Sequence, residues 1–157
     1  MGMDVYGLNP QNETGNYFRN NVWHWHPLWD FCCDIDPSLV NKVPLAHSND
    51  GDGLKDCEEC LNLANKIDNS INNGYAEFYI QQREIEIKNK PDLVCHICDG
   101  TGQRPDGLYG IEWKQDGCNA CNGSGYVKDP SSHYHLNLEN IKEFSSFLKN
   151  CGGFQIF

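Results

Sequence analysis

The chain of 157 residues lacks any long apolar run and any secretory signal. A helix needs about 20 consecutive apolar residues to cross a membrane, and no stretch approaches that length, so we expect no membrane association. The N-terminal MGMDVYGLNPQNETG has neither the basic nor the apolar segment of a signal peptide. Both absences predict a cytoplasmic protein.

Clustered positive charge is also missing. The twelve Lys and Arg residues are scattered singly among 22 Asp and Glu residues, and the net charge is −10. Non-specific binding to nucleic acid requires grouped Lys and Arg side chains, so a nucleic-acid partner is disfavoured. An acidic surface instead favours a basic protein partner, or serves only solubility.

Nine cysteines are present, and four of them belong to a duplicated octapeptide. Residues 95–102 and 118–125 both read C-x-x-C-x-G-x-G. Two such turns supply four thiolates, Cys95, Cys98, Cys118 and Cys121, which complete the shell of a closed tetrahedral zinc site. We therefore predict one structural Zn²⁺, because four protein ligands leave no open position for water.

The glycines of the repeat support this prediction. A glycine two residues after each second cysteine lets the backbone turn with positive φ, and such a turn can aim backbone N–H groups at the sulfurs. The second glycine of each repeat fits a tight exit from the turn. Two disulfides or two reduced dithiols would not explain why both glycines recur.

The octapeptides resemble the cysteine-rich region of DnaJ-type chaperones, which carries four such repeats and two zinc sites. The resemblance covers residues 95–125 and implies a zinc-held β-hairpin that contacts proteins. The His-Pro-Asp signature of the J domain is missing, since His26-Pro27 is followed by Leu28, so co-chaperone activity is not implied. The chain ends resemble those of short uncharacterised bacterial and phage proteins, which would place a viral protein in the host cytoplasm.

Periodicity outside the repeat predicts a single α+β domain, 1–157: a small helical domain with short terminal strands and an inserted zinc-bound hairpin at 92–128. Apolar residues spaced by three and four predict a helix over 54–71, and further helices follow before Pro91 and after the capping residue Asn137. The other expected elements are strands at 3–8 and 154–157, extended chain over 16–26, and short helices at 27–35 and 38–42. Pro27 is expected in the first turn of the helix at 27–35.

A third C-x-x-C, Cys57 to Cys60, lies on the apolar stripe of the predicted helix. Free cysteine on such a face behaves as a small hydrophobic residue, so we expect buried thiols here and not metal ligands. Cys32, Cys33 and Cys151 are given the same interpretation.

Two other segments could form a recognition surface. In the first, Trp23 and Trp25 supply area while His24 and His26 supply polar contacts; in the second, Asp50 and Asp52 belong to the turn-forming run 48–53. The same run partly matches a calcium loop, but Ser48 and Lys55 break the match, and a turn before a helix explains the same residues. The pairs His24/His26 and His133/His135 could instead meet in a second metal centre.

These observations favour a zinc-stabilised binding or adaptor module that contacts a protein partner. One alternative is a small-molecule or metal-dependent enzyme built from segment 17–30 and the acidic turn 47–53; it is less favoured because the predicted zinc site is closed. A weaker alternative is an acidic decoy that occupies a nucleic-acid-binding protein. The oligomeric state is left open.

Overall fold

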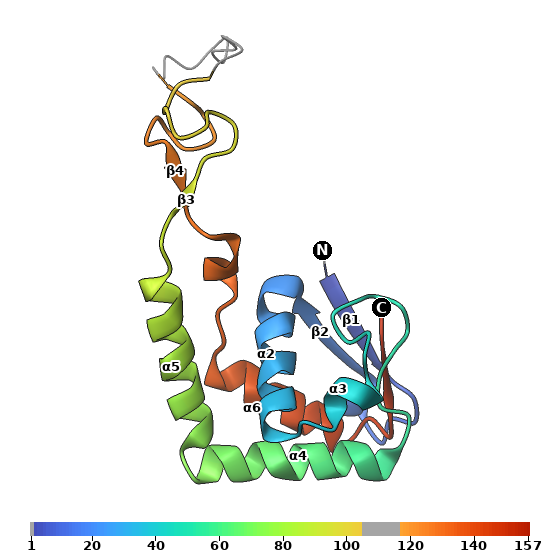
Figure 1. The fold of residues 1–157 in the computed structure, drawn as a ribbon. Helices are drawn as coiled ribbons and strands as arrows, with labels where there is room; N and C mark the ends of the chain where they lie inside the picture. Colours follow the sequence, from blue (N-terminus) through green and yellow to red (C-terminus); the bar gives the residue numbers. More distant parts are fainter. Residues whose placement is uncertain (1, 105–116) are drawn as a thin grey trace. The chain divides into compact units, whose positions relative to one another are not determined.

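The computed structural model describes residues 2–104 and 117–157 and shows an α+β protein (Figure 1). The chain divides into two compact units: unit 1 comprises Met1–Ile85 and Tyr134–Phe157, and unit 2 comprises Glu86–His133. Unit 2 extends on both sides beyond the predicted insertion, 92–128. Whether the units form a single domain stays a prediction.

Unit 1 contains a three-stranded antiparallel sheet in the order β2-β1-β5. Its strands are β1 (Gly2–Gly7), β2 (Tyr17–Asn21) and β5 (Phe154–Ile156). The two predicted terminal strands are present and pair with each other, with Val5 opposite Ile156. Alternation along β1 places Met3 and Val5 in the core and turns Asp4 and Tyr6 to the other face.

Side-chain caps begin the main helices. Asn21, Asp56 and Asn137 accept hydrogen bonds from backbone N–H groups in the first turns of α2, α4 and α6. The predicted cap at Asn137 is confirmed. The helices are α1 (Glu13–Asn16), α2 (Val22–Ile35), α3 (Leu39–Lys42), α4 (Cys57–Asn72), α5 (Tyr75–Asn89), whose last turn belongs to unit 2, and α6 (Leu138–Leu148).

The start of α2 differs from the prediction. The helix begins at Val22, directly after its cap, so 22–26 are helical and not extended. Pro27 lies inside the helix and not at its start, and it has no N–H to donate to the carbonyl one turn earlier. The aromatic and β-branched residues of this stretch indicated extended chain, but the Asn21 cap and tertiary burial favour the helix.

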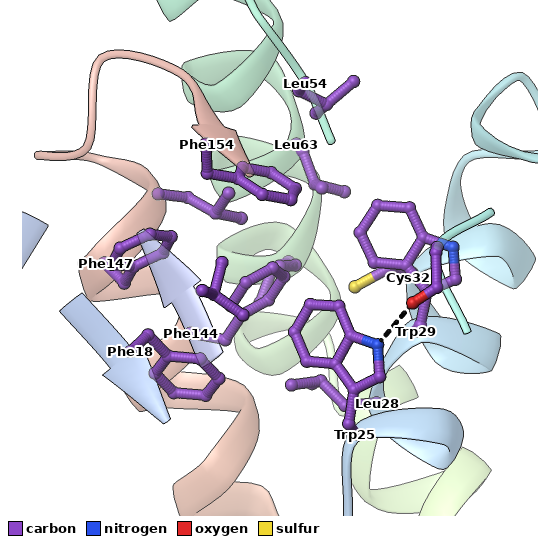
Figure 2. Packing of buried hydrophobic residues seen from close by; sticks show 14 of the residues in the cluster. Phe18, Trp25, Leu28, Trp29, Cys32, Leu54, Leu63, Phe144, Phe147 and Phe154 are labelled. Carbon is purple, nitrogen blue, oxygen red and sulfur yellow. Dashed lines mark hydrogen bonds between the residues drawn. The ribbon is translucent and has the colours of Figure 1, made fainter. Parts of the chain in front are cut away.

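The core of unit 1 is aromatic (Figure 2). Trp25 from α2 packs against Phe18 from β2 and Phe144 from α6, with ring centroids 6.5 and 5.5 Å away. Its indole N–H donates to the carbonyl of Ala46 at 2.7 Å. Trp25 is completely buried, which corrects its predicted place on a recognition surface: it is a core residue.

The cysteines of unit 1 are free thiols. Cys32, Cys60 and Cys151 are buried as predicted, whereas Cys33 and Cys57 are partly exposed. The thiol of Cys151 and burial together raise the pKa of Cys60. Cys32, Cys60 and Cys151 therefore behave as small core residues, whereas the expected full burial of Cys33 and Cys57 is wrong.

Unit 2 has little regular structure in its described residues. Strands β3 (Leu93–Val94) and β4 (Tyr126–Val127) form an antiparallel hairpin, and the 3₁₀ turn η1 (Pro130–His133) follows. An ion pair of 2.7 Å between Lys128 and Asp92 joins the chain at the base of the hairpin. Among the described residues of either unit, no helix has the length and apolar character needed to cross a membrane.

Candidate metal centre

The four cysteines of the duplicated octapeptide converge in unit 2. Their sulfur atoms lie within 4.8 Å of one another. The Sγ atoms of Cys95 and Cys118 are 3.9 Å apart, and those of Cys98 and Cys121 are 3.7 Å apart. Four sulfurs held tetrahedrally at about 2.3 Å from zinc would be about 3.8 Å apart. All four are buried and none is in a disulfide, so the site can bind a metal ion.

Both turns adopt the same backbone conformation. The residue after the second cysteine has positive φ in each, 49° at Asp99 and 52° at Asn122. The next residue does too, 80° at Gly100 and 78° at Gly123. Asp and Asn tolerate this left-handed region better than most side chains, and glycine enters it freely. The sequence repeat is therefore a structural repeat, and the expected positive φ of the first glycines is confirmed.

A hydroxyl between the two glycines closes each turn. Thr101 donates to the carbonyl of Cys98 at 2.6 Å, and Ser124 donates to the carbonyl of Cys121 at 2.7 Å. Each hydroxyl also accepts the N–H of the residue two positions later. These residues vary between Thr and Ser, and sequence reasoning passed over them; their shared position in both repeats was the available signal.

The two turns hold each other through reciprocal contacts. The N–H of Cys95 donates to Gly125 at 2.8 Å, and the N–H of Cys118 donates to Gly102 at 2.6 Å. A Cβ atom at Gly102 would lie 2.3 Å from the carbonyl oxygen of Gly123, and one at Gly125 would lie 2.2 Å from that of Gly100. The second glycine of each repeat is thus required because the opposite turn's backbone passes against it.

The sulfurs differ in how readily they ionise. Burial raises the pKa of Cys95 to about 11. Burial also opposes ionisation of Cys121, but the N–H of Gly125, which donates to its Sγ at 3.2 Å, and the neighbouring thiols lower the pKa of Cys121 to about 7. Metal binding takes thiolates and releases their protons, and the Gly125 N–H remains as a donor to a metal-bound sulfur.

The residues of the predicted recognition surface lie in unit 1. Trp23 is 40% exposed and its ring lies 4.9 Å from that of Tyr134. His24 is partly exposed. The His26 ring is stacked on Tyr134 at 5.4 Å and lies 4.3 Å from the ring of His47.

The acidic turn has a structural role at Asp52. The Asp52 carboxylate accepts the N–H of Leu45 at 2.9 Å and that of Gly53 at 2.9 Å. Asp50 is exposed. The helix that follows is capped by Asp56, so the acids of 48–53 are not its cap.

The H-x-H pairs do not assemble a second metal centre. Within residues 2–104 and 117–157, the four cysteines are the one group of three or more potential ligands that lie together. His135 instead contacts Glu84, with Nδ1 2.8 Å from Oε1. The proximity of His26 to His47 was not anticipated, because no motif connects α2 with the loop that carries His47.

Comparison with known proteins supports the interpretation of the cysteine cluster. A segment of 44 residues, 28% of this chain, is 43% identical to chaperone protein DnaJ of Staphylococcus saprophyticus. That segment is a tenth of the length of the DnaJ protein. No protein-family model and no solved structure matches the chain. The match and the geometry of the four cysteines together fit a DnaJ-like zinc module.

Proposed function

We propose that the protein is a cytoplasmic adaptor in which Zn²⁺, held by Cys95, Cys98, Cys118 and Cys121, shapes a hairpin that contacts a partner protein. The convergence of four buried sulfurs within 4.8 Å carries the zinc assignment. Thiolates are soft ligands, and a tetrahedral set of four sulfurs is typical of zinc or of iron–sulfur centres. The similarity to DnaJ favours zinc.

Exposed apolar side chains around the cluster support the partner contact. Leu93, Val94, Ile97 and Tyr126 are between 37% and 58% exposed. The sulfur cluster occupies the interior of the described part of unit 2, so these side chains have no apolar core there to enter. A small module that leaves such residues in water offers them to another surface.

The zinc assignment is tested by elemental analysis of the purified protein, which should find about one zinc per chain. Replacement of Cys98 or Cys121 by Ser should lose the metal, whereas a Cys57→Ala/Cys60→Ala variant should keep it. An unchanged zinc content in both serine variants would reject the assignment.

The partner contact is tested separately with a photo-crosslinking residue at Tyr126. The crosslinked partner should disappear in a Val94→Lys variant that keeps its zinc, and in Cys98→Ser. A matched crosslinker at Leu61, an exposed residue on α4 of unit 1, gives the background. Equal capture by all four proteins would reject the hairpin as the contact surface.

A further inference from the structure

The sheet of unit 1 has two edges, and residues 51–54 cover one of them. The N–H of Phe154 donates to Leu54 at 2.6 Å, and the N–H of Ile156 donates to Asp52 at 2.9 Å. In return, Ile156 accepts the N–H of Gly51 at 2.8 Å. Three backbone groups on the outer side of β5, the N–H of Phe154 and the N–H and C=O of Ile156, are therefore paired.

The other edge, β2, is open at Arg19. Asp4 exchanges backbone hydrogen bonds with Phe157 at 2.6 and 2.7 Å, so its N–H and C=O face β5. The backbone groups of the adjacent residues on β1, Met3 and Val5, therefore face β2, where Met3 lies opposite Asn20 and Val5 lies opposite Phe18. By alternation, the N–H and C=O of Arg19 face away from the sheet, and no backbone group in the described ranges hydrogen-bonds to them.

A hollow of about 500 Å³ lies between this strand and α6. Phe18 and Phe147, whose ring centroids are 5.8 Å apart, form its apolar floor and are almost fully buried. Its helix side carries Glu139, Glu143 and Ser146. An unpaired strand edge beside a groove with an apolar floor is the arrangement by which proteins bind extended peptides as an added strand.

We propose that β2 and this hollow bind an extended peptide segment of a partner protein, which pairs with the main chain of Arg19 and places a basic side chain beside Glu139 or Glu143. This surface lies in unit 1 and goes beyond the contact proposed for the zinc hairpin. The added strand uses the hydrogen-bonding groups that the edge leaves open.

Charge selects a basic segment. Glu139 and Glu143 are exposed, and the described residues include no ion pair with either; Lys142 between them offsets one of the two charges. Arg19 is paired with Asp4 at 3.7 Å. Unit 1 carries 7 basic and 15 acidic residues, a net charge of −8, which attracts basic segments over a longer range.

The same charges disfavour a second copy of the chain as the occupant. Two β2 strands paired antiparallel about Arg19 would place like charges opposite each other, which destabilises a strand pair. They would also bring together two units with a net charge of −8 each. A heterologous basic segment meets neither penalty.

The test uses the zinc-loaded full chain and three synthetic heptapeptides: Thr-Lys-Val-Phe-Val-Lys-Thr, a version with both lysines replaced by glutamate, and a version with both valines, one of which pairs with Arg19 when the lysines face the hollow, replaced by proline. Binding is followed by backbone amide NMR. The lysine peptide should shift the Arg19 amide, the glutamate peptide should bind about tenfold more weakly, and the proline peptide, which loses a ladder hydrogen bond, should not bind detectably.

Variants distinguish the edge from the side chains. Arg19→Pro removes the outward N–H and should abolish binding, whereas Arg19→Ala keeps that N–H and should retain it. Ser146→Trp places a large side chain in the hollow from α6, leaves the sequence of the strand unchanged and should also abolish binding; circular dichroism and zinc content check the fold. The proposal is overturned by an Arg19 amide that millimolar lysine peptide does not shift, by equal binding to Ser146→Trp, or by a concentration-dependent shift without peptide.

Discussion

Unit 1 and unit 2 differ in what replaces water in their interiors. Unit 1 buries a continuous apolar cluster drawn from its sheet and its helices. In unit 2 the buried hydrophobic cluster of the described residues consists of the four cysteines, with Val127 packed against it. Burial of apolar area stabilises unit 1 at roughly 25 cal/mol per Å², whereas the described residues of unit 2 bury little apolar area, so we expect them to depend on metal coordination.

This difference explains why two kinds of sequence signal were informative. An apolar core tolerates exchange of one hydrophobic residue for another of similar volume, so in the sequence it is marked by the spacing of apolar residues and not by their identity. A metal site tolerates no exchange of its ligands, so in the sequence it is marked by a fixed motif. Unit 2 is therefore expected to fail when a single sulfur is lost, while unit 1 responds in graded steps.

Metal removal should have the largest effect and should separate the units. Structural zinc contributes an apparent binding free energy of about 10–16 kcal/mol to small modules, so a chelator or Cys121→Ser should unfold the hairpin. In NMR spectra, the backbone amide signals of 95–102 should move to the chemical shifts of an unfolded chain, while the helical circular dichroism signal of unit 1 persists. Cooperative loss of both signals would show that the units fold as one.

The next largest effect concerns the core of unit 1. Trp25→Ala should lower its free energy of unfolding by about 3–5 kcal/mol, because the change empties a fully buried site and leaves the Ala46 carbonyl unpaired. Denaturant unfolding measures the loss, and zinc content should not change. Trp23→Ala is the matched control: this indole is 40% exposed, so its removal should cost far less.

Local signals predicted much of the fold. The helix before Pro91, the Asn137 cap and the terminal strands follow from periodicity, caps and breakers that neighbouring residues supply. The helix predicted over 54–71 is also present, but it begins at Cys57 because Asp56 caps it. The start of α2 did not follow, because the residues after Asn21 have mixed propensity and burial of Trp25 decides their conformation. Sequence could place Trp25 among apolar residues but not say whether a partner or the core would cover it.

The candidate site shows the same limit. Its ligands and first glycines were predictable because each acts within one turn. Gly102 and Gly125 act between turns, and the reason for them appeared only when the opposite backbone was in place. His47 beside His26 is a contact between a loop and a helix, which no local pattern encodes.

The reciprocal glycines provide a finer test of unit 2. Gly125→Ala places a Cβ 2.2 Å from a backbone oxygen at a residue with φ of 79°. Gly100→Ala has φ of 80° but meets only the Val94 side chain, at 3.2 Å. Both substitutions carry the left-handed cost of about 1–2 kcal/mol, so the difference between them reports the clash. In competition with a zinc chelator, Gly125→Ala should bind zinc at least about tenfold more weakly than Gly100→Ala. Equal zinc affinities of the two variants would contradict the close approach of the two turns.

The smallest effect is a pH dependence of unit 1 at His26. Burial of the ring, followed by the neighbouring His47, lowers the pKa of His26 in the folded state, and its Nε2 is buried with no hydrogen-bond partner among the described residues. The unfolded chain then binds the proton more readily, so folding stability rises with pH. Stability should therefore be complete above the unfolded pKa of about 6.5 and should fall as the pH drops from there towards the lower folded-state pKa.

His26→Phe keeps a ring against Tyr134 and should remove this part of the pH dependence. Denaturant midpoints of the two proteins, measured from about pH 8 down to about pH 5 by the tryptophans of unit 1, should diverge with acidification; parallel curves would show that His26 does not titrate on unfolding.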